Sequence, residues 1–321
     1  MRIHDSKAEV RIGISACLLG QPVRYDGGHK RDAFLTESLA RFVTFVPVCP
    51  EVEIGLGTPR ESLRLERAPR GMRLVEPRTG RDHTSAMRAY AEARVRALAR
   101  LDLSGYVLKE RSPSCGMEGV RTYDARGVPA ASGRGLFAEA LLARCPLLPV
   151  EEEGRLRDPW RRASFLERVF AYRRLRRLFA PRWRLGDLAR FHAAAQTQVA
   201  AHDARACERL GRLVAHARSL PRAVVARRYA EAHLAALAKP ATRARHARVL
   251  RGIAGRLEET LAPREREELA EAIDAFHRGD APLWETLTLL RLRVRVHRVA
   301  RLSEQTYLEP LPIDLMRAAG N

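Results

Sequence analysis

The sequence has little lysine and no long apolar run. Lysine occurs only at positions 7, 30, 109 and 239, so arginine carries nearly all of the positive charge. No apolar stretch approaches the roughly 20 residues that a membrane-spanning helix needs. The first ten residues, MRIHDSKAEV, contain no apolar core of a signal peptide. We therefore expect a cytoplasmic protein without a membrane-spanning segment.

The five cysteines form no C-x-x-C pair, which excludes the familiar zinc-ribbon spacing. Their number is odd, and no export signal accompanies them, so stable disulfides are not expected. Metal binding or thiol chemistry is then the expected use of any cysteine that is not simply buried in a core.

The chain carries a net charge of +20, and the two halves share it unequally. Residues 1–160 hold 26 Lys and Arg against 21 Asp and Glu, whereas residues 161–321 hold 32 against 17. A genome that favours arginine would raise the charge of both halves alike. The excess in the second half therefore favours a polyanionic partner, of which nucleic acid is the usual one.

The length of 321 residues suggests two domains, and the sequence pattern agrees. In residues 1–155, the buried runs RIGISAC, FVTFVPVC, SGYVLKE and CPLLPVEEE alternate with the helical patterns FLTESLARF, TSAMRAYAEARVRALARL and GLFAEALLARC. Such alternation predicts an α/β domain with a Rossmann-like parallel sheet.

Strand signals almost disappear after residue 155. Residues 156–184 are predicted to form a linker or connecting helix, and residues 185–321 an all-α bundle whose helices are separated by prolines. The proline-containing tail QTYLEPLPIDLM is expected to lie extended on the surface.

Three cysteines share one kind of position, directly after a predicted buried strand. Cys17 follows RIGIS, Cys49 follows FVTFVPV, and Cys115 follows YVLKE through a short turn. The carboxyl ends of parallel strands lie along one edge of a sheet, where ligands bind. We therefore expect these three thiols to converge.

Three convergent thiolates suit zinc or an iron–sulfur cluster. No fourth cysteine follows a strand, and ordinary burial explains Cys145 and Cys207, which belong to predicted helices. A [4Fe–4S] cube held by three cysteines would keep one iron free of protein ligands. Such an iron is a Lewis acid that could accept sulfur from a substrate.

Glu51 and Ser112 are placed to move protons near these thiols. Glu51 lies two residues after Cys49, and Ser112 lies three residues before Cys115. Either could donate or accept a proton beside a metal. On the residues alone, a solvated loop charge and a turn-capping serine remain open alternatives.

Other charged residues and glycines near the same edge are candidates for binding a substrate. The charges after Cys17 could hold a planar base or a phosphate, the charges before Ser112 could form a wall of the site, and a glycine-rich helix start can bind an anion. Surface turns are the alternative interpretation. The candidates are Arg24, Tyr25, Asp26, Lys30, Lys109, Arg111, Gly133 and Gly135.

The segments that carry these residues resemble the thiouracil desulfidase family. The resemblance covers roughly residues 10–155 and rests on SACLLG with VRYDG, on VCPE and on KERSPSCG. Further along, FH at 191–192, LGRLVA at 210–215 and QTYLEP at 305–310 resemble the helical domain often fused behind it.

The resemblance implies a [4Fe–4S] cluster held by Cys17, Cys49 and Cys115, whose fourth iron takes up the sulfur of the substrate. It also implies that Glu51 and Ser112 are the acid/base pair. Water would replace the sulfur on the base, and hydrogen sulfide would leave without net electron transfer.

The two-domain arrangement is similar to bacterial desulfidases that convert 4-thiouridine in tRNA back to uridine, which implies thiolated tRNA as substrate and RNA binding by the basic domain. Arginine-rich helices are suited to phosphates. Two alternatives stay open. One is a desulfidase of free thiouracil, and the other is a non-enzymatic nucleic-acid-binding regulator with a metal or iron–sulfur sensor whose metal positions are all filled by protein ligands.

Overall fold

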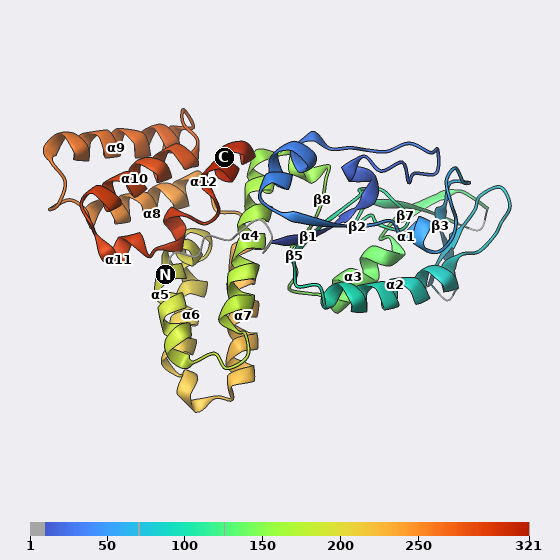
Figure 1. The fold of residues 1–321 in the computed structure, drawn as a ribbon, viewed down its shortest axis with the longest axis horizontal. Helices are drawn as coiled ribbons and strands as arrows, with labels where there is room; N and C mark the ends of the chain where they lie inside the picture. The colour runs from blue at the N-terminus through green and yellow to red at the C-terminus, as the bar shows by residue number, and fades with distance from the viewer. Residues whose placement is uncertain (1–9, 70, 125, 321) are drawn as a thin grey trace. The chain divides into compact units, whose positions relative to one another are not determined.

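A computed structural model describes residues 10–69, 71–124 and 126–320. The chain divides into two units, one ending at Asp158 and the other beginning at Pro159. The first unit contains strands and helices, and the second consists of helices and turns (Figure 1). This architecture confirms the predicted fold class. The boundary lies close to residue 155, where the sequence pattern changes.

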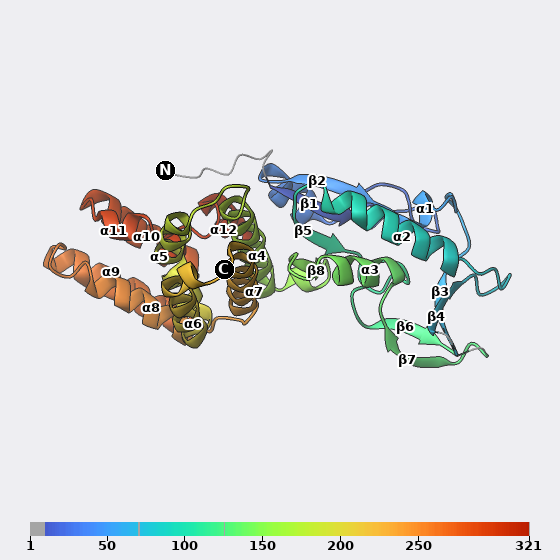
Figure 2. The same ribbon diagram turned by 90° about the horizontal axis from the view of Figure 1, so that it is seen from below.

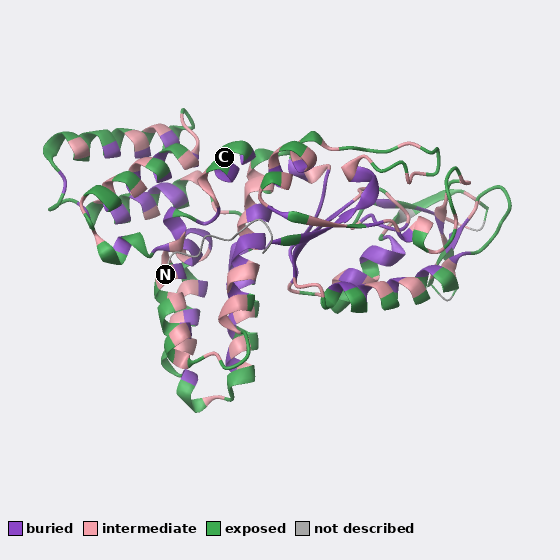
Figure 3. Ribbon diagram, in the orientation of Figure 1, coloured by how far each residue is buried: buried purple, intermediate pink, exposed green. Residues whose placement is uncertain are grey.

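The first unit is built on a four-stranded parallel sheet with the order β2-β1-β5-β8. Its strands are β1 (Arg11–Ser15), β2 (Thr44–Val48), β5 (Leu103–Leu108) and β8 (Val150–Glu152). All six residues of β5 are buried, as expected of a central parallel strand covered on both faces (Figure 3). The four strands coincide with the four apolar runs of the sequence.

Helices α2 (Thr84–Ala99) and α3 (Leu136–Arg144) pack side by side against one face of this sheet (Figures 1 and 2). Phe137 of α3 meets the buried Tyr106 of β5 with 6.0 Å between the ring centroids. The inward face of α2 follows helical spacing and consists of Met87, Ala91, Val95 and Leu98.

A second four-stranded sheet was not anticipated from the sequence. Its order is β4-β3-β6-β7, with β3 (Arg64–Ala68) paired antiparallel to β4 (Gly71–Val75) and parallel to β6 (Val120–Tyr123), and with β7 (Pro129–Gly133) antiparallel to β6. These strands are short, and arginine interrupts β3, β4 and β6, so they lack the apolar runs that identified the first sheet.

Short helical turns connect the strands to the region of the cysteines. A 3₁₀ turn at Ala16–Leu19 follows β1, and α1 (Pro50–Glu53) follows β2. The predicted helix FLTESLARF is a π-helical turn at Phe34–Ser38 continued by a 3₁₀ turn at Leu39–Arg41.

The second unit packs helices around an apolar interior. They are α4 (Pro159–Leu178), α5 (Leu185–His202), α6 (Ala204–Ala215), α7 (Arg222–Leu237), α8 (Arg243–Gly255), α9 (Pro263–Arg278), α10 (Leu283–Val296), α11 (Ala300–Ser303) and α12 (Ile313–Ala319). Helix α4 lies within the stretch expected to link the domains. In the described parts of the chain, no helix has the length and apolarity to span a bilayer.

The expectation of an extended surface tail is wrong. Thr306–Leu308 forms a 3₁₀ turn and Ile313–Ala319 forms α12. Tyr307, Leu308 and Leu315 are buried. The prolines stand at the ends of these turns, where a proline costs no helical hydrogen bond, so the tail folds back onto the unit.

A buried histidine makes the second unit sensitive to acid. His233 is 1% exposed, and neither ring nitrogen has a hydrogen-bond partner among the described residues. Burial, followed by the charges of His192 and Arg174, lowers the pKa of His233 from 6.5 to about 3. The unfolded chain therefore takes up this proton first, so stability is lost as the pH falls from about 6.5 toward 3.

We expect His233→Phe to lose less stability than the wild type between neutral pH and about pH 4. Phenylalanine keeps the packing against Tyr229 and Phe191 but cannot take up a proton. Thermal unfolding followed by circular dichroism across this range checks the expectation, with the exposed His216→Gln as control. Parallel pH curves for His233→Phe and the wild type would contradict it.

Candidate active site

Cys17, Cys49 and Cys115 each follow one of three neighbouring strands of the parallel sheet. Cys17 lies in the 3₁₀ turn after β1, Cys49 directly precedes α1 after β2, and Cys115 lies in the turn after β5. Since β2, β1 and β5 are adjacent and parallel, their carboxyl ends meet at one edge. The structure thus brings the three cysteines to the same region.

The pKa values of the three thiols depend on one another. Burial, together with the neighbouring Cys49, raises the pKa of Cys17 to about 11. Burial also raises the pKa of Cys49. Burial raises the pKa of Cys115 well above its usual range, and the nearby Cys49 and Cys17 both contribute to this rise. The three sulfur atoms are therefore near enough to interact electrostatically, and without a cation they are neutral thiols.

The three thiols are a donor set for a soft metal. Thiolates bind soft metals, and coordination removes the proton that burial would otherwise retain. Across the described residues, no group of three His, Cys, Asp or Glu side chains is placed to hold a single ion. The three thiols therefore lie in one region without forming a single-ion site among the described residues.

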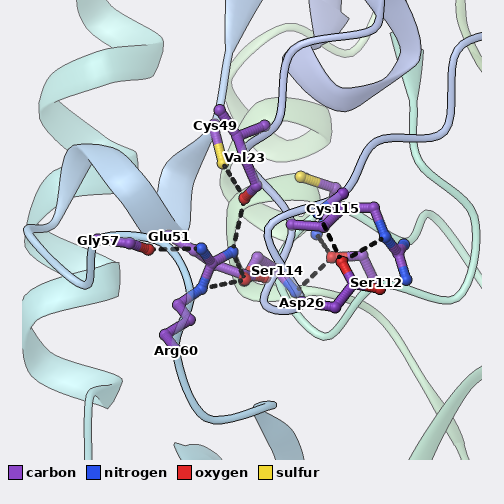
Figure 4. A network of polar contacts seen from close by, with 11 residues as sticks. Val23, Asp26, Cys49, Glu51, Gly57, Arg60, Ser112, Ser114 and Cys115 are labelled. Atoms are coloured by element: carbon purple, nitrogen blue, oxygen red, sulfur yellow. Dashed lines mark hydrogen bonds and ion pairs between the residues drawn. The ribbon is translucent and has the colours of Figure 1, made fainter.

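Glu51 lies at the centre of a polar network beside the cysteines (Figure 4). The buried Ser114 donates a hydrogen bond from Oγ to Glu51 Oε1 at 2.9 Å, and Arg60 Nε donates to Glu51 Oε2 at 3.1 Å. Helix α1 carries Glu51 in its first turn, so the carboxylate is fixed two residues beyond Cys49. Both carboxylate oxygens are thereby engaged by the protein.

Ser112 caps the turn that carries Cys115. Its Oγ accepts hydrogen bonds from the amides of Ser114 at 3.2 Å and Cys115 at 3.1 Å. A hydroxyl that accepts twice still has its own proton to donate. Ser112 therefore has the turn-capping role, one of the alternatives left open by the sequence, and keeps its own hydroxyl proton.

The loop that carries Arg24, Tyr25 and Asp26 returns to Cys17. The amide of Lys30 donates to the carbonyl of Cys17 at 2.9 Å, which closes the loop at its base. Arg24 Nε lies 3.4 Å from Asp26 Oδ1, and its guanidinium carbon lies 5.3 Å from the centre of the Tyr25 ring. These side chains form one group attached to the cysteine site.

Lys109 and Arg111 occupy different environments. Lys109 Nζ forms an ion pair with Glu153 and donates to the carbonyl of Glu110 at 3.1 Å, while its amide donates to Ser15 Oγ at 2.9 Å. Lys109 also lowers the pKa of Cys17, so it belongs to the surroundings of the site. Arg111 is exposed and has a φ of 59°.

The structure gives Gly133 and Gly135 a packing role. A Cβ on Gly135 would lie 2.5 Å from the carbonyl carbon of Ser114, and one on Gly133 would lie 2.8 Å from Thr122. The first amides of α3 are already used: those of Phe137 and Ala138 donate to the carbonyl of Ser114 at 3.0 and 3.2 Å. These donors, which an anion would need, hold the Cys115 turn instead.

Sequence reasoning missed four residues around the site. Ser114 and Arg60 hold Glu51. Glu53 accepts from the amide of Cys49 at 3.0 Å, and Ser15 lowers the pKa of Cys115 by a hydrogen bond. Ser114, Glu53 and Ser15 each lie within four residues of a cysteine, which was an available signal. Arg60 lies eleven residues beyond Cys49 and had none.

Known proteins resemble each part of the chain. A family model described as 2-thiouracil desulfurase matches residues 12–153, and a model described as a protein of unknown function (DUF1722) matches residues 197–312. The chain is 33% identical over 116 residues to the uncharacterized protein YbbK of Bacillus subtilis (strain 168), a match that covers 33% of this chain and 72% of YbbK.

A solved structure gives a further match. TudS, described as a [4Fe-4S]-dependent thiouracil desulfidase, is 37% identical in sequence, and the match covers 46% of this chain and 94% of TudS. The superposition has a TM-score of 0.37.

Proposed function

Because the chain belongs to the 2-thiouracil desulfurase family, we propose that it is a desulfidase that hydrolyses the C–S bond of a thiolated nucleobase. The C=S group becomes C=O, one water is consumed and hydrogen sulfide is released, so no electrons are transferred. The observation that carries this proposal is the meeting of Cys17, Cys49 and Cys115 at one edge of the sheet beside the Glu51 network, with Cys17 and Cys115 buried.

Cys17, Cys49 and Cys115 would hold a [4Fe–4S] cluster, which when bound would supply an iron that polarises the C–S bond. Glu51 would then accept the proton of the attacking water, since it is the carboxylate fixed beside the cysteines. Ser112 would donate its hydroxyl proton to the departing sulfur. The burial of Cys17 and Cys115 would limit the access of bulk water to the reacting atoms.

We further propose that the substrate is 4-thiouridine in tRNA and that the helical unit binds the RNA. Residues 161–321 hold 32 Lys and Arg against 17 Asp and Glu. Binding of a phosphate backbone would use this positive excess, whereas binding of a free base does not require it. The activity described for TudS favours a second candidate, a desulfidase of free thiouracil. The two candidates differ in whether the helical unit contributes to turnover.

Removal of the helical unit separates the two substrates. We expect a chain ending at Asp158 to lose roughly 100-fold or more in kcat/KM on thiolated tRNA, since several phosphate contacts are lost, and to keep its activity on free 4-thiouracil. Both proteins are reconstituted anaerobically with iron and sulfide and assayed for hydrogen sulfide. Equal turnover of tRNA by both would contradict the role in RNA binding.

Salt provides a control within the full-length protein. Activity on tRNA is expected to fall steeply as salt is raised, whereas activity on the free base is expected to change little. If the full-length, cluster-loaded protein released sulfide from neither substrate, the proposed activity would be wrong.

A further inference from the structure

Arg60 joins two parts of the site that lie far apart in the sequence. Its side chain is 7% exposed, and all three guanidinium nitrogens donate hydrogen bonds (Figure 4). Nε and Nη2 reach the Glu51 carboxylate, Nη2 also reaches the carbonyl of Val23 at 3.0 Å, and Nη1 reaches the carbonyl of Gly57 at 2.7 Å. One side chain thus holds a carboxylate and two backbone segments.

The backbone of Arg60 contacts the same loop as its side chain. Its amide donates to the carbonyl of Tyr25 at 2.8 Å. Within the loop, the amide of Arg24 donates to Gly28 at 3.2 Å and that of Gly27 donates to Arg24 at 3.0 Å, so residues 24–28 form a closed turn. The turn that presents Tyr25 is therefore fixed to Arg60 at two carbonyls.

The carbonyl of Val23 also links Arg60 to a cysteine. Cys49 Sγ lies 3.7 Å from this oxygen, which Arg60 Nη2 contacts as well. Only a planar guanidinium can serve the carboxylate and both carbonyls at once, because its donors point in fixed, different directions. A lysine would keep the charge but could not occupy all of these positions.

We propose that Arg60 is a positioning residue that holds the Glu51 carboxylate and the turn of residues 24–28 in one fixed arrangement. Loss of Arg60 lets the carboxylate move relative to the reacting carbon and lets the turn move relative to the substrate. The expected effect of Arg60 on turnover rests on the proposed function, whereas its role in fixing the turn of residues 24–28 does not.

Steady-state kinetics of the reconstituted full-length protein test the first half. We expect Arg60→Lys to lower kcat roughly 100-fold, the cost of misplacing a reacting group by about 1 Å, and to raise KM several-fold. Arg73→Lys is the control, because Arg73 is 44% exposed and pairs with Asp82 away from the cysteines. Iron content and visible absorption establish that each variant is loaded. A kcat for Arg60→Lys equal to that of the control would overturn the proposal.

A double-mutant cycle distinguishes positioning from general damage to the fold. If Arg60 acts through Glu51, the loss of kcat in the double variant Glu51→Gln with Arg60→Lys should equal the loss in Glu51→Gln alone. If instead the loss of kcat in the double variant equals the product of the two single losses, Arg60 acts independently of Glu51, and the positioning role of Arg60 is overturned.

Hydrogen exchange on the metal-free protein tests the second half without any turnover. We expect the amides of residues 24–28 to exchange faster in Arg60→Lys than in the wild type, with no change in β5. Unchanged exchange would overturn the hold on the turn. A wild type that releases no sulfide would refute the proposed function, while the exchange result would still decide whether Arg60 fixes the turn.

Discussion

The Cys115→Ala variant is expected to bind almost no cluster and to turn over no thiolated base. Cys115 is 6% exposed, and its pKa is raised by burial and by both other thiols, so its loss removes the most deeply buried sulfur of the three. Two remaining thiols cannot retain a cluster that three are needed to hold. Iron and sulfide content per chain, visible absorption and sulfide release after anaerobic reconstitution measure the effect.

Cys145→Ala is the matched control for this variant. Cys145 belongs to the same unit but caps the end of α3, away from the carboxyl ends of β1, β2 and β5. It is expected to load iron and turn over substrate as the wild type does. Retention of the full iron content and activity by Cys115→Ala would disprove its assignment as a ligand.

The Glu51→Gln variant is expected to load the cluster normally and to lose roughly 10²–10⁴-fold in kcat, the usual contribution of a general acid or base. Glutamine keeps the shape of the side chain and can still contact Ser114 and Arg60, but it cannot take up the proton of water. Single-turnover release of sulfide, normalised to iron content, measures the loss. A kcat within a few-fold of the wild type would remove Glu51 from the mechanism.

Measurements of kcat should then distinguish the roles of Ser112 and Ser114. Ser112→Ala is expected to lower kcat, because it removes the proton available to the departing sulfur. Ser114→Ala is expected to act through Glu51, so that it adds nothing to the loss in Glu51→Gln.

The region of the site was predictable from the sequence because one rule places it. Apolar runs identified β1, β2 and β5, and the geometry of parallel sheets brings their carboxyl ends together. Cys17, Cys49, Glu51 and the loop after Cys17 are local to these strand ends. No long-range information was needed to expect them in one place.

Contacts between distant segments could not be predicted in this way. The link between Arg60 and Glu51 depends on how the chain turns after α1, and the pairing of Ser114, rather than Ser112, with Glu51 depends on the side-chain directions in one turn. The spacing from Cys115 makes Ser112 and Ser114 equally plausible partners of Glu51. Only the folded structure shows that Ser114 holds the Glu51 carboxylate and that Ser112 caps the Cys115 turn.

The second sheet and the tail escaped prediction for a different reason. Strands β3 and β6 each lie in a polar stretch, where pairing with β4 and β7 defines them more than hydrophobicity does. In the tail, prolines suggested an extended chain, but Tyr307 hydrogen-bonds His246 at 2.9 Å and is buried with Leu308. Tertiary contacts overrode the local preference in both cases.

The carbonyl of Ser114, held by the amides of Phe137 and Ala138, makes the turn around Cys115 an extension of α3 rather than an independent loop. Helix α3 in turn packs through Phe137 onto Tyr106 in the middle of the sheet. The proposed cluster ligand Cys115 is therefore anchored by the hydrophobic core, whereas a zinc finger depends on its metal to fold. If the proposed cluster is bound there, we expect its loss to oxygen to leave the turn folded, so that the same molecule can be refilled once iron and sulfide return.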